Sequence, residues 1–587
     1  MKNNETTHTV GRHKGRPISF SAAWGRVLSL VLLTLSAMPS YAANKHATSK
    51  FSPDLMSAIG PNGKVTVNVQ YKAYPTKGYL KGRQSSGATL RWQLPAITAV
   101  TMTVPATMLT TLANEANVVY ISPDRAMVMS ANPQTEEFAT AVEADVAASQ
   151  YALDGTGIGV AIIDSGIATH PDLNNANGVS RVVYSQSFVA GDTTTSDAFG
   201  HGTHVAGLIG GSGANSGSAN GYAATYAGMA PNVNLINLRV LDQNGSGTDS
   251  QVVAAIQQAI ALKNTYNIRV ISMSLGRPVF ESYTLDPVDQ AVEAAWQAGI
   301  VVVAAAGNNG RFAPTNGFGT IGVPANDPAV ITVGATMTLD TATRVDDKIA
   351  SYSSKGPTAV DHIVKPDLVA PGNAQVSLRA PGSTLDTTYP QYEVASSNGT
   401  SSYFVLSGTS MATPVVSGAV ALMLQQNPSL TPDQVKARLM KTAWKGFGQY
   451  TSSHDHWGNL YNNEYDLFTY GAGYLDLDAA LGNTDVASGV ALSPTVVVNP
   501  NGTVTVQNTV PDSVFAGSSV VWGATSVVWG TSVVWGANAI SASSVVWGAT
   551  SVVWGATSVS GYSVVWGATS TVASSVAALS DGDPGDN

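Results

Sequence analysis

Four polar residues stand out because each is set among glycines or other small residues that keep bulky side chains away. Asp164 closes the apolar run "GVAIID", His201 lies in "FGHGTHVAG", Asn308 follows "VVVAAAG", and Ser410 lies in "SGTSMATP". Together they offer a carboxylate, an imidazole base, an amide donor and a hydroxyl nucleophile, which are the groups that acyl transfer through an activated serine requires. They are far apart along the chain, so the fold has to bring them together.

The sequence around Ser410 predicts a helix that begins at or just after this residue. Apolar residues recur with helical spacing after Thr413, Pro414 suits a first turn, and Asn427-Pro428 ends the pattern. Ser410 would then lie at a helix N-terminus, where free backbone N–H groups favour developing negative charge. The alternative is that Ser410 only caps a buried helix.

The other polar residues also have simpler interpretations. Asp164 could cap a helix after its strand, and Asn308 in "GNNG" could be a turn residue. His201 and His204 are three residues apart, as in some metal sites, but a third ligand at a suitable spacing is missing and the chain has no cysteine. We therefore interpret His204 as structural. The presence of all four polar groups in one chain favours catalysis over the separate explanations.

The elements expected to position these residues are buried parallel strands that alternate with helices. The strand-like runs are "GVAIIDSG", "NVNLINLRVLD", "IRVISMSLG", "IVVVAAAGN" and "AVITVGAT". Capping residues mark the helix starts: Thr248 with Gln251, Asp286, and Thr431 with Gln434. The pattern predicts an α/β fold with a doubly wound, mostly parallel sheet and helices on both faces. In such a sheet ligands bind at the carboxyl ends of the strands.

With these residues in view, the chain resembles the subtilisin-like serine proteases. The matching stretches are "AIIDSGIATHPDL", "GHGTHVAGLIGG", "AAAGNNG", "KPDLVAPG" and "SGTSMATPVVSG". Their order, with the Asp before the His and the Ser last, is also that of the family, and the resemblance covers roughly residues 140–480. It implies a secreted serine endopeptidase that hydrolyses protein or peptide substrates through an acyl-enzyme.

The resemblance assigns a role to each of the four residues. Ser410 would be the nucleophile, His201 the general base and then acid, and Asp164 the carboxylate that orients the imidazole. The amide of Asn308, with the backbone N–H of Ser410, would hold the oxyanion.

The resemblance also implies where substrate and metal would bind. Ser274, Leu275 and Gly276 would pair with the substrate backbone, which would bind in an extended form, and line the specificity pocket. No cofactor is required for the chemistry. Asp172 in "HPDL" matches a position that binds calcium in some relatives, so a structural calcium ion is a further expectation, with its ligands unknown.

Composition and resemblance together divide the chain into four parts. Residues 1–42 carry basic residues, the apolar run "VLSLVLLTL" and small residues before a cut after Ala42, which predicts a secretory signal peptide and a secreted protein. Residues 43–130 contain the strand-like "KVTVNVQY" and a strand, helix and strand pattern after it, and resemble an inhibitor-type propeptide of small α+β fold. Residues 131–485 would be the catalytic domain, and residues 486–587 a tail.

Charge is unevenly distributed between these parts. Residues 43–130 hold nine Lys or Arg against three Asp or Glu, a net charge of +6, whereas residues 131–587 hold 15 against 34, a net charge of −19. We expect the two parts to attract each other, so that the propeptide inhibits its own enzyme until it is cut near residues 126–140. The acidic body argues against nucleic-acid binding, and the absence of cysteine excludes disulfides and thiolate metal sites.

The tail is a repeat array of a different composition. The motif "SVVWG" occurs six times, and no Lys, Arg or Glu follows residue 485. Alternating Val and Trp with turn residues between them favour short stacked strands, used for cell-surface attachment or self-association. A flexible low-complexity extension is the alternative.

Two other functions remain open from the sequence. A sedolisin-type acid peptidase shares the "SGTS" motif but uses Glu where this chain has His201. A surface-attached adhesive or scaffold protein with a vestigial protease domain would make the tail the working part, although all four catalytic positions are filled.

Overall fold

The computed structural model describes residues 50–127, 138–448, 450–455 and 459–498, with three short strands beyond them. These strands are β21 (Val504–Gln507), β22 (Ile540–Ser541) and β23 (Val559–Ser560). The predicted signal peptide and the six SVVWG repeats therefore lie outside the described residues. Among the described helices, none combines the length and the apolar composition that crossing a membrane requires.

Residues 50–127 form a four-stranded antiparallel sheet in the order β2-β3-β1-β4. Its elements are β1 (Lys64–Tyr71), α3 (Lys77–Ser85), β2 (Thr89–Leu94), η1 (Pro95–Ile97), β3 (Ala99–Pro105), α4 (Ala106–Ala113) and β4 (Val118–Pro123). In β1 the valines Val65, Val67 and Val69 are buried, as the alternation in "KVTVNVQY" predicts. The predicted strand and the strand, helix and strand that follow it are confirmed.

The central sheet has the order β13-β12-β11-β10-β6-β8-β7, and β14 also pairs with β12. Its strands are β6 (Gly159–Asp164), β7 (Val182–Ser187), β8 (Asn234–Arg239), β10 (Ile268–Met273), β11 (Val301–Ala305), β12 (Ile331–Met337), β13 (Lys348–Ile349) and β14 (Leu368–Pro371). Every pair is parallel except β12 with β13. Since β6, β11 and β12 are buried along their whole lengths, the expected α/β fold with a covered parallel sheet is confirmed.

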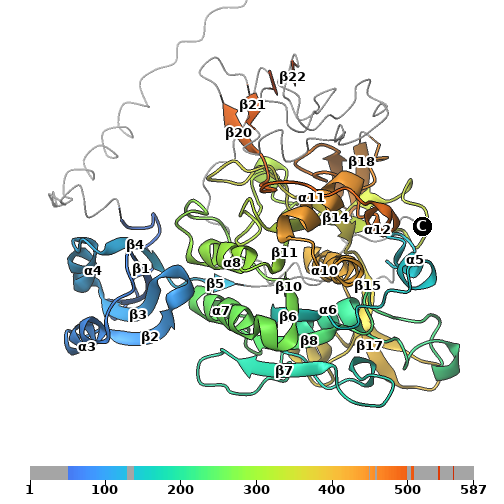
Figure 1. Cartoon of the computed structure of the whole chain (residues 1–587), viewed down its shortest axis with the longest axis horizontal. Coiled ribbons are helices and arrows are strands. Elements are labelled where there is room, and N and C mark those ends of the chain that lie inside the picture. The colour runs from blue at the N-terminus through green and yellow to red at the C-terminus, as the bar shows by residue number, and fades with distance from the viewer. Residues whose placement is uncertain are drawn as a thin grey trace, which may run out of the picture. The chain divides into compact units, whose positions relative to one another are not determined.

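Two groups of helices cover this sheet, and Figure 1 shows its strands between them. The helices after residue 138 are α5 (Ala144–Ser149), α6 (His201–Gly210), α7 (Asp249–Tyr266), α8 (Pro287–Gln297), α9 (Thr384–Thr388), α10 (Thr409–Gln426), α11 (Pro432–Thr442) and α12 (Leu477–Gly482). α6 packs against α10, while α7 packs against α8. Every residue of α10 from Thr409 to Leu424 is buried, so this helix belongs to the hydrophobic core.

The helix starts follow from their capping residues. Thr248 with Gln251 and Thr431 with Gln434 form the two predicted capping boxes, at the N-termini of α7 and α11. The Asp286 carboxylate accepts a backbone N–H in the first turn of α8. Each of these side chains satisfies a donor that the helix itself leaves unpaired, which is why local sequence was enough to find these positions.

Shorter elements complete the described chain. The strands are β5 (Ala126–Met127), β9 (Gly247–Thr248), β15 (Gln375–Leu378), β16 (Glu393–Ala395), β17 (Ser401–Leu406), β18 (Tyr450–His454), β19 (Leu460–Glu464) and β20 (Thr495–Val498), and the 3-10 turns are η2 (Pro171–Leu173), η3 (Ser218–Asn220), η4 (Ala313–Thr315) and η5 (Pro390–Tyr392). β5 pairs with β9, and β15, β17 and β16 form a separate sheet before α10. The chain after Asp485 still packs on the domain, because Ser493 is buried and donates a hydrogen bond to Asp367 at 2.6 Å.

Candidate active site

The structure joins two of the four residues directly. Asp164 is the last residue of β6 and His201 the first residue of α6, and His201 Nδ1 lies 3.0 Å from Asp164 Oδ1 and 3.1 Å from Oδ2. Both side chains are buried. The next residue has to be glycine, since a Cβ on Gly202 would come within 2.2 Å of the Gly166 carbonyl oxygen. The strand end and the helix start can therefore approach closely enough for this contact.

Sequence reasoning missed a second carboxylate that supports this pair. Asp197 is buried and accepts hydrogen bonds from the backbone N–H groups of Gly200 and Thr203, at 2.7 and 2.8 Å. It also accepts the Ser165 hydroxyl at 2.8 Å, and that hydroxyl lies 3.2 Å from Asp164. Burial raises the pKa of Asp197. The available signal was an aspartate shortly before a helix that starts with "GHGTH", where the first N–H groups need acceptors.

Ser410 lies in the first turn of α10, which begins at Thr409, one residue earlier than the sequence predicted. In this structure its hydroxyl donates to the Ser274 carbonyl oxygen at 3.1 Å, and the Ser274 hydroxyl donates to the Ser410 carbonyl oxygen at 2.8 Å. His201 Nε2 is buried and has no hydrogen-bond partner among the described residues. The structure thus places His201 with Asp164 and Ser410 with Ser274, and it shows no hydrogen bond between Ser410 and His201 in the described chain.

The amide of Asn308 has a fixed orientation beside Ser410. Its Oδ1 accepts the backbone N–H of Thr409 at 2.9 Å and the Thr409 hydroxyl at 3.0 Å. Because a backbone N–H can only donate, the amide oxygen must face Thr409, and the NH₂ group points away from it. Asn308 follows β11 by a few residues, so an amide donor is held next to the N-terminus of α10.

The expected substrate-binding stretch continues directly from β10. Ser274 and Leu275 are buried, while Gly276 is partly exposed. A Cβ on Gly276 would lie 2.9 Å from the Val323 carbonyl oxygen, so glycine allows the backbones to approach here. Arg277, the next residue, pairs with Val323 in an isolated bridge.

The side chain of Asp172 does not fit the expected calcium site. Oδ1 accepts the Asn215 backbone N–H at 2.9 Å and its side-chain NH₂ at 2.7 Å, and Oδ2 accepts the Tyr403 hydroxyl at 2.6 Å. Both carboxylate oxygens are therefore directed at protein donors rather than left for a cation. Within the part of the chain that the structure describes, no cluster of three or more His, Cys, Asp or Glu side chains is placed to hold a metal ion.

His204 is held by backbone groups instead of by a metal or a carboxylate. Its Nε2 lies 3.0 Å from the Gln375 carbonyl oxygen and 3.1 Å from that of Phe404. Burial, with a smaller contribution from His201, lowers the pKa of His204 to about 3. This geometry supports the structural interpretation of His204, because a neutral imidazole that donates from Nε2 joins α6 to β15 and β17.

The low pKa of His204 predicts how the domain loses stability in acid. Unfolded chains bind the proton below pH ~6.5 but the folded chain does not until about pH 3, so stability falls with pH across this window by about 1.4 kcal/mol per unit. We expect His204→Gln, whose amide can still donate to both carbonyls, to remove roughly 3 kcal/mol of the loss between about pH 7 and pH 4. Denaturant unfolding of the Ser410→Ala chain with and without this exchange measures the difference. The exposed His454 provides the control His454→Gln, and equal losses in all three chains would contradict the prediction.

The structure thus combines a covered, mostly parallel sheet with an Asp–His pair at a strand end and with a helix-borne serine beside an amide of fixed orientation. Residues 155–473 match the family model described as the subtilase family. Serine protease AprX of Bacillus subtilis (strain 168) is 42% identical over 309 residues, which cover 51% of this chain and 65% of AprX, somewhat less than two thirds of its length. Subtilisin DY of Bacillus licheniformis is 37% identical over 328 residues, which cover 56% of this chain and 91% of that protein.

Among solved structures, fervidolysin from Fervidobacterium pennivorans, described as a keratinolytic enzyme related to subtilisin, matches with a TM-score of 0.56 and 23% identity. The match covers 78% of this chain and 69% of fervidolysin, and it concerns the fold. The chain belongs to the subtilase family of serine peptidases.

Proposed function

We propose that this chain is a secreted serine endopeptidase in which Asp164, His201 and Ser410 form the catalytic triad. The observation that carries the proposal is the buried Asp164–His201 contact of 3.0 Å, made at the start of a helix that packs against the helix of Ser410. A lone capping serine or strand-end aspartate would not need such a pair. Asn308 adds an amide donor at the same edge of the sheet, where the carboxyl ends of β6 and β11 lie.

In the proposed reaction the Ser410 hydroxyl turns from the Ser274 carbonyl toward His201 Nε2, the imidazole nitrogen that has no partner in the described chain. The Ser410 oxygen then bonds to the substrate carbonyl carbon while His201 takes the proton, and Asp164 stabilises the imidazolium. The Asn308 NH₂ and the Ser410 N–H bind the oxyanion. His201 returns the proton to the leaving amine, and water releases the acyl group by the same steps.

Substrate would bind as an extended strand between β9 and residues 274–276. The contact between β5 and β9 supports this mode, because β5 is itself an extended segment that pairs antiparallel with Gly247 and Thr248. The substrate backbone would replace β5, since strand addition needs only backbone hydrogen bonds and accepts many sequences.

Residues 43–130 are proposed to be the inhibitory propeptide of this enzyme, and the contacts of residues 50–127 support this. Asp124 accepts the Ser250 backbone N–H at 2.7 Å and the Ser250 hydroxyl at 2.6 Å, so it caps α7 of the catalytic part. Gln70 accepts the side-chain NH₂ of Gln290 on α8 at 2.9 Å. The charges of +6 and −19 favour the same docking, and a cut near residues 126–140 would release the inhibitor.

Secretion through residues 1–42, and surface attachment or self-association through the SVVWG repeats, complete the proposal on the sequence alone. The alternative of an adhesive protein with a vestigial protease domain gains no support from the described site, which keeps every polar group the reaction needs.

A fluorophosphonate probe tests the proposed function. Attack by the activated serine forms a Ser410 Oγ–P bond and expels fluoride, with His201 accepting the proton, so we expect a single adduct on the peptide that contains Ser410. Mass spectrometry of the matured native chain locates the adduct, and His201→Ala should abolish it. Absence of any adduct, or an adduct on another residue in the native chain, would contradict the proposal.

A further inference from the structure

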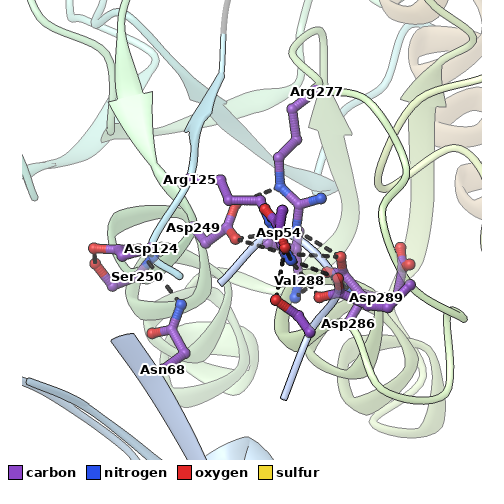
Figure 2. A network of polar contacts seen from close by, with 12 residues as sticks. Asp54, Asn68, Asp124, Arg125, Asp249, Ser250, Arg277, Asp286, Val288 and Asp289 are labelled. Atoms are coloured by element: carbon purple, nitrogen blue, oxygen red, sulfur yellow. Dashed lines mark hydrogen bonds and ion pairs between the residues drawn. The ribbon is translucent and has the colours of Figure 1, made fainter. Parts of the chain in front are cut away.

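A buried arginine of the N-terminal part is held by carboxylates of the catalytic part. We call Asp249, Glu281 and Asp286 the acidic cluster. Arg125 donates to both oxygens of Glu281, at 2.7 and 2.5 Å, and its Nη1 lies 3.8 Å from Asp249 and from Asp286. Figure 2 shows Arg125 beside Asp249 and Asp286, with Arg277 joining the same network. The guanidinium thus lies among three carboxylates that come from later segments of the chain.

The backbone of Arg125 is held as well as its side chain. The Asp249 N–H donates to the Arg125 carbonyl oxygen at 3.0 Å, and the next two residues pair as β5 with β9, so that Met127 lies opposite Gly247. Arg125 therefore reaches the acidic cluster from the position directly before β5. Arg125 lies two residues before Met127, which pairs with Gly247. Gly247 belongs to β9, the strand that we propose to pair with substrate.

Once Arg125 has left, the catalytic part holds an unbalanced charge. Three carboxylates would face one guanidinium, that of Arg277, which already binds Asp249 at 2.7 Å and Asp286 at 2.5 Å. Among the described residues, Arg125 supplies the hydrogen bonds that Glu281 accepts. Burial and then the Asp286 carboxylate raise the pKa of Glu281 to about 7, against the opposing effect of Arg125. At a pH above this pKa the cluster would carry the excess negative charge, and a new cation would stabilise it.

The site that binds the Arg125 side chain suits an arginine better than a lysine. The two parallel contacts to Glu281 use the planar fork of the guanidinium, and Arg125 Cζ lies 5.0 Å from the centre of the Phe280 ring. Asp54 also binds Arg125, at 2.8 and 2.9 Å, but it belongs to the N-terminal part and would leave with it. Glu281 and Phe280 stay with the catalytic part.

We propose that in the mature enzyme the acidic cluster and Phe280 form a specificity site for an arginine side chain of the substrate. The arginine stands two residues N-terminal to the substrate residue that pairs with Gly247, in the place that Arg125 occupies in the precursor. The inference rests on the proposed function, because it requires a protease whose N-terminal part departs. It makes arginine-containing segments preferred substrates without any requirement at the cleaved bond itself.

Paired fluorogenic peptides test this inference with the enzyme matured from its full precursor. In one series a single arginine is moved one residue at a time along the N-terminal side of the cleaved bond, and in the other citrulline, its neutral isostere, takes each place. At about pH 8 we expect one position at which arginine exceeds citrulline by about tenfold or more in kcat/KM, as a hydrogen-bonded charge pair would give. Glu281→Gln should reduce this ratio to near one, whereas Asp145→Asn, which removes an exposed acid on α5, should preserve it.

The outcomes separate this inference from the proposed function. Cleavage of all peptides with equal rates for arginine and citrulline at every position would overturn the specificity site and leave the protease intact. An arginine preference that survives Glu281→Gln would also overturn it. If no peptide is cleaved, the proposed function fails first. If Glu281→Gln does not mature, the native enzyme still tests the inference. A ratio of arginine to citrulline rates near one at every position would overturn it, and a high ratio at one position would support it.

Discussion

Replacing Ser410 by alanine is expected to abolish the hydrolysis of unfolded casein. The exchange removes only the hydroxyl oxygen, which is the atom proposed to bond to the substrate, while the helix start that carries it remains. A loss on the order of 10⁶-fold is the size found when subtilisin, a member of the same family, loses its nucleophile. The full precursor should also keep its mass, whereas the native chain should lose roughly its first 130 residues.

The measurement compares casein cleavage and precursor mass at neutral pH in three chains. Ser417→Ala is the matched control, because Ser417 is a buried serine of the same helix whose hydroxyl contacts only Ser272 and the Thr413 carbonyl among the described residues. This control should lose about 1 kcal/mol of stability and keep hydrolysis and maturation. Activity in Ser410→Ala equal to that of the native chain would remove Ser410 from the mechanism.

Replacing Asp367 by asparagine is expected to destabilise the fold by roughly 3–5 kcal/mol. Asp367 is fully buried and accepts the Lys365 ammonium at 2.8 Å, with the Lys436 ammonium at 3.2 Å. Burial alone would raise the pKa of Asp367, but the two ammonium groups outweigh it and hold the pKa below its usual value. Asparagine preserves the shape and leaves two buried cations without a counter-charge.

Equilibrium unfolding in denaturant measures this loss, with Ser410→Ala as the parent chain and Asp145→Asn as an exposed control. Burial lowers the pKa of Lys436 to about 7, so the unfolded chain binds a proton that the folded chain resists. The stabilities of the parent and of Asp367→Asn should therefore both rise with pH above 7. A stability within about 0.5 kcal/mol of the parent would show that the two buried lysines do not need the Asp367 carboxylate.

Local patterns were sufficient for much of the fold and for the residues proposed to be catalytic. The capping boxes at Thr248 and Thr431, and the buried strand that ends at Asp164, involve neighbours within a few residues, so the sequence displays them directly. The motifs around His201 and Ser410 could be recognised for the same reason. Their roles stay predictions until the serine is tested.

Contacts between distant segments could not be predicted in this way. The support that Asp197 gives to Ser165 joins residues 32 positions apart, and the hydrogen bond from Ser493 to Asp367 spans 126 positions. The residues next to Asp197 or Ser493 in the sequence do not indicate which distant residue each one contacts. The contact between Arg125 and Glu281 could not be predicted for the same reason, since the two residues are 156 positions apart. The opposite net charges of the two parts predicted only that they attract each other.

The complete burial of α10 from Thr409 to Leu424 also bears on how long the enzyme would survive among copies of itself. A protease cuts segments that can open into an extended strand, and core helices open only when the whole domain unfolds. The helix that carries Ser410, the proposed nucleophile, is thus among the last places where self-digestion could begin. An enzyme that attacks unfolded chains would in this way spare its proposed catalytic serine until its fold as a whole is lost.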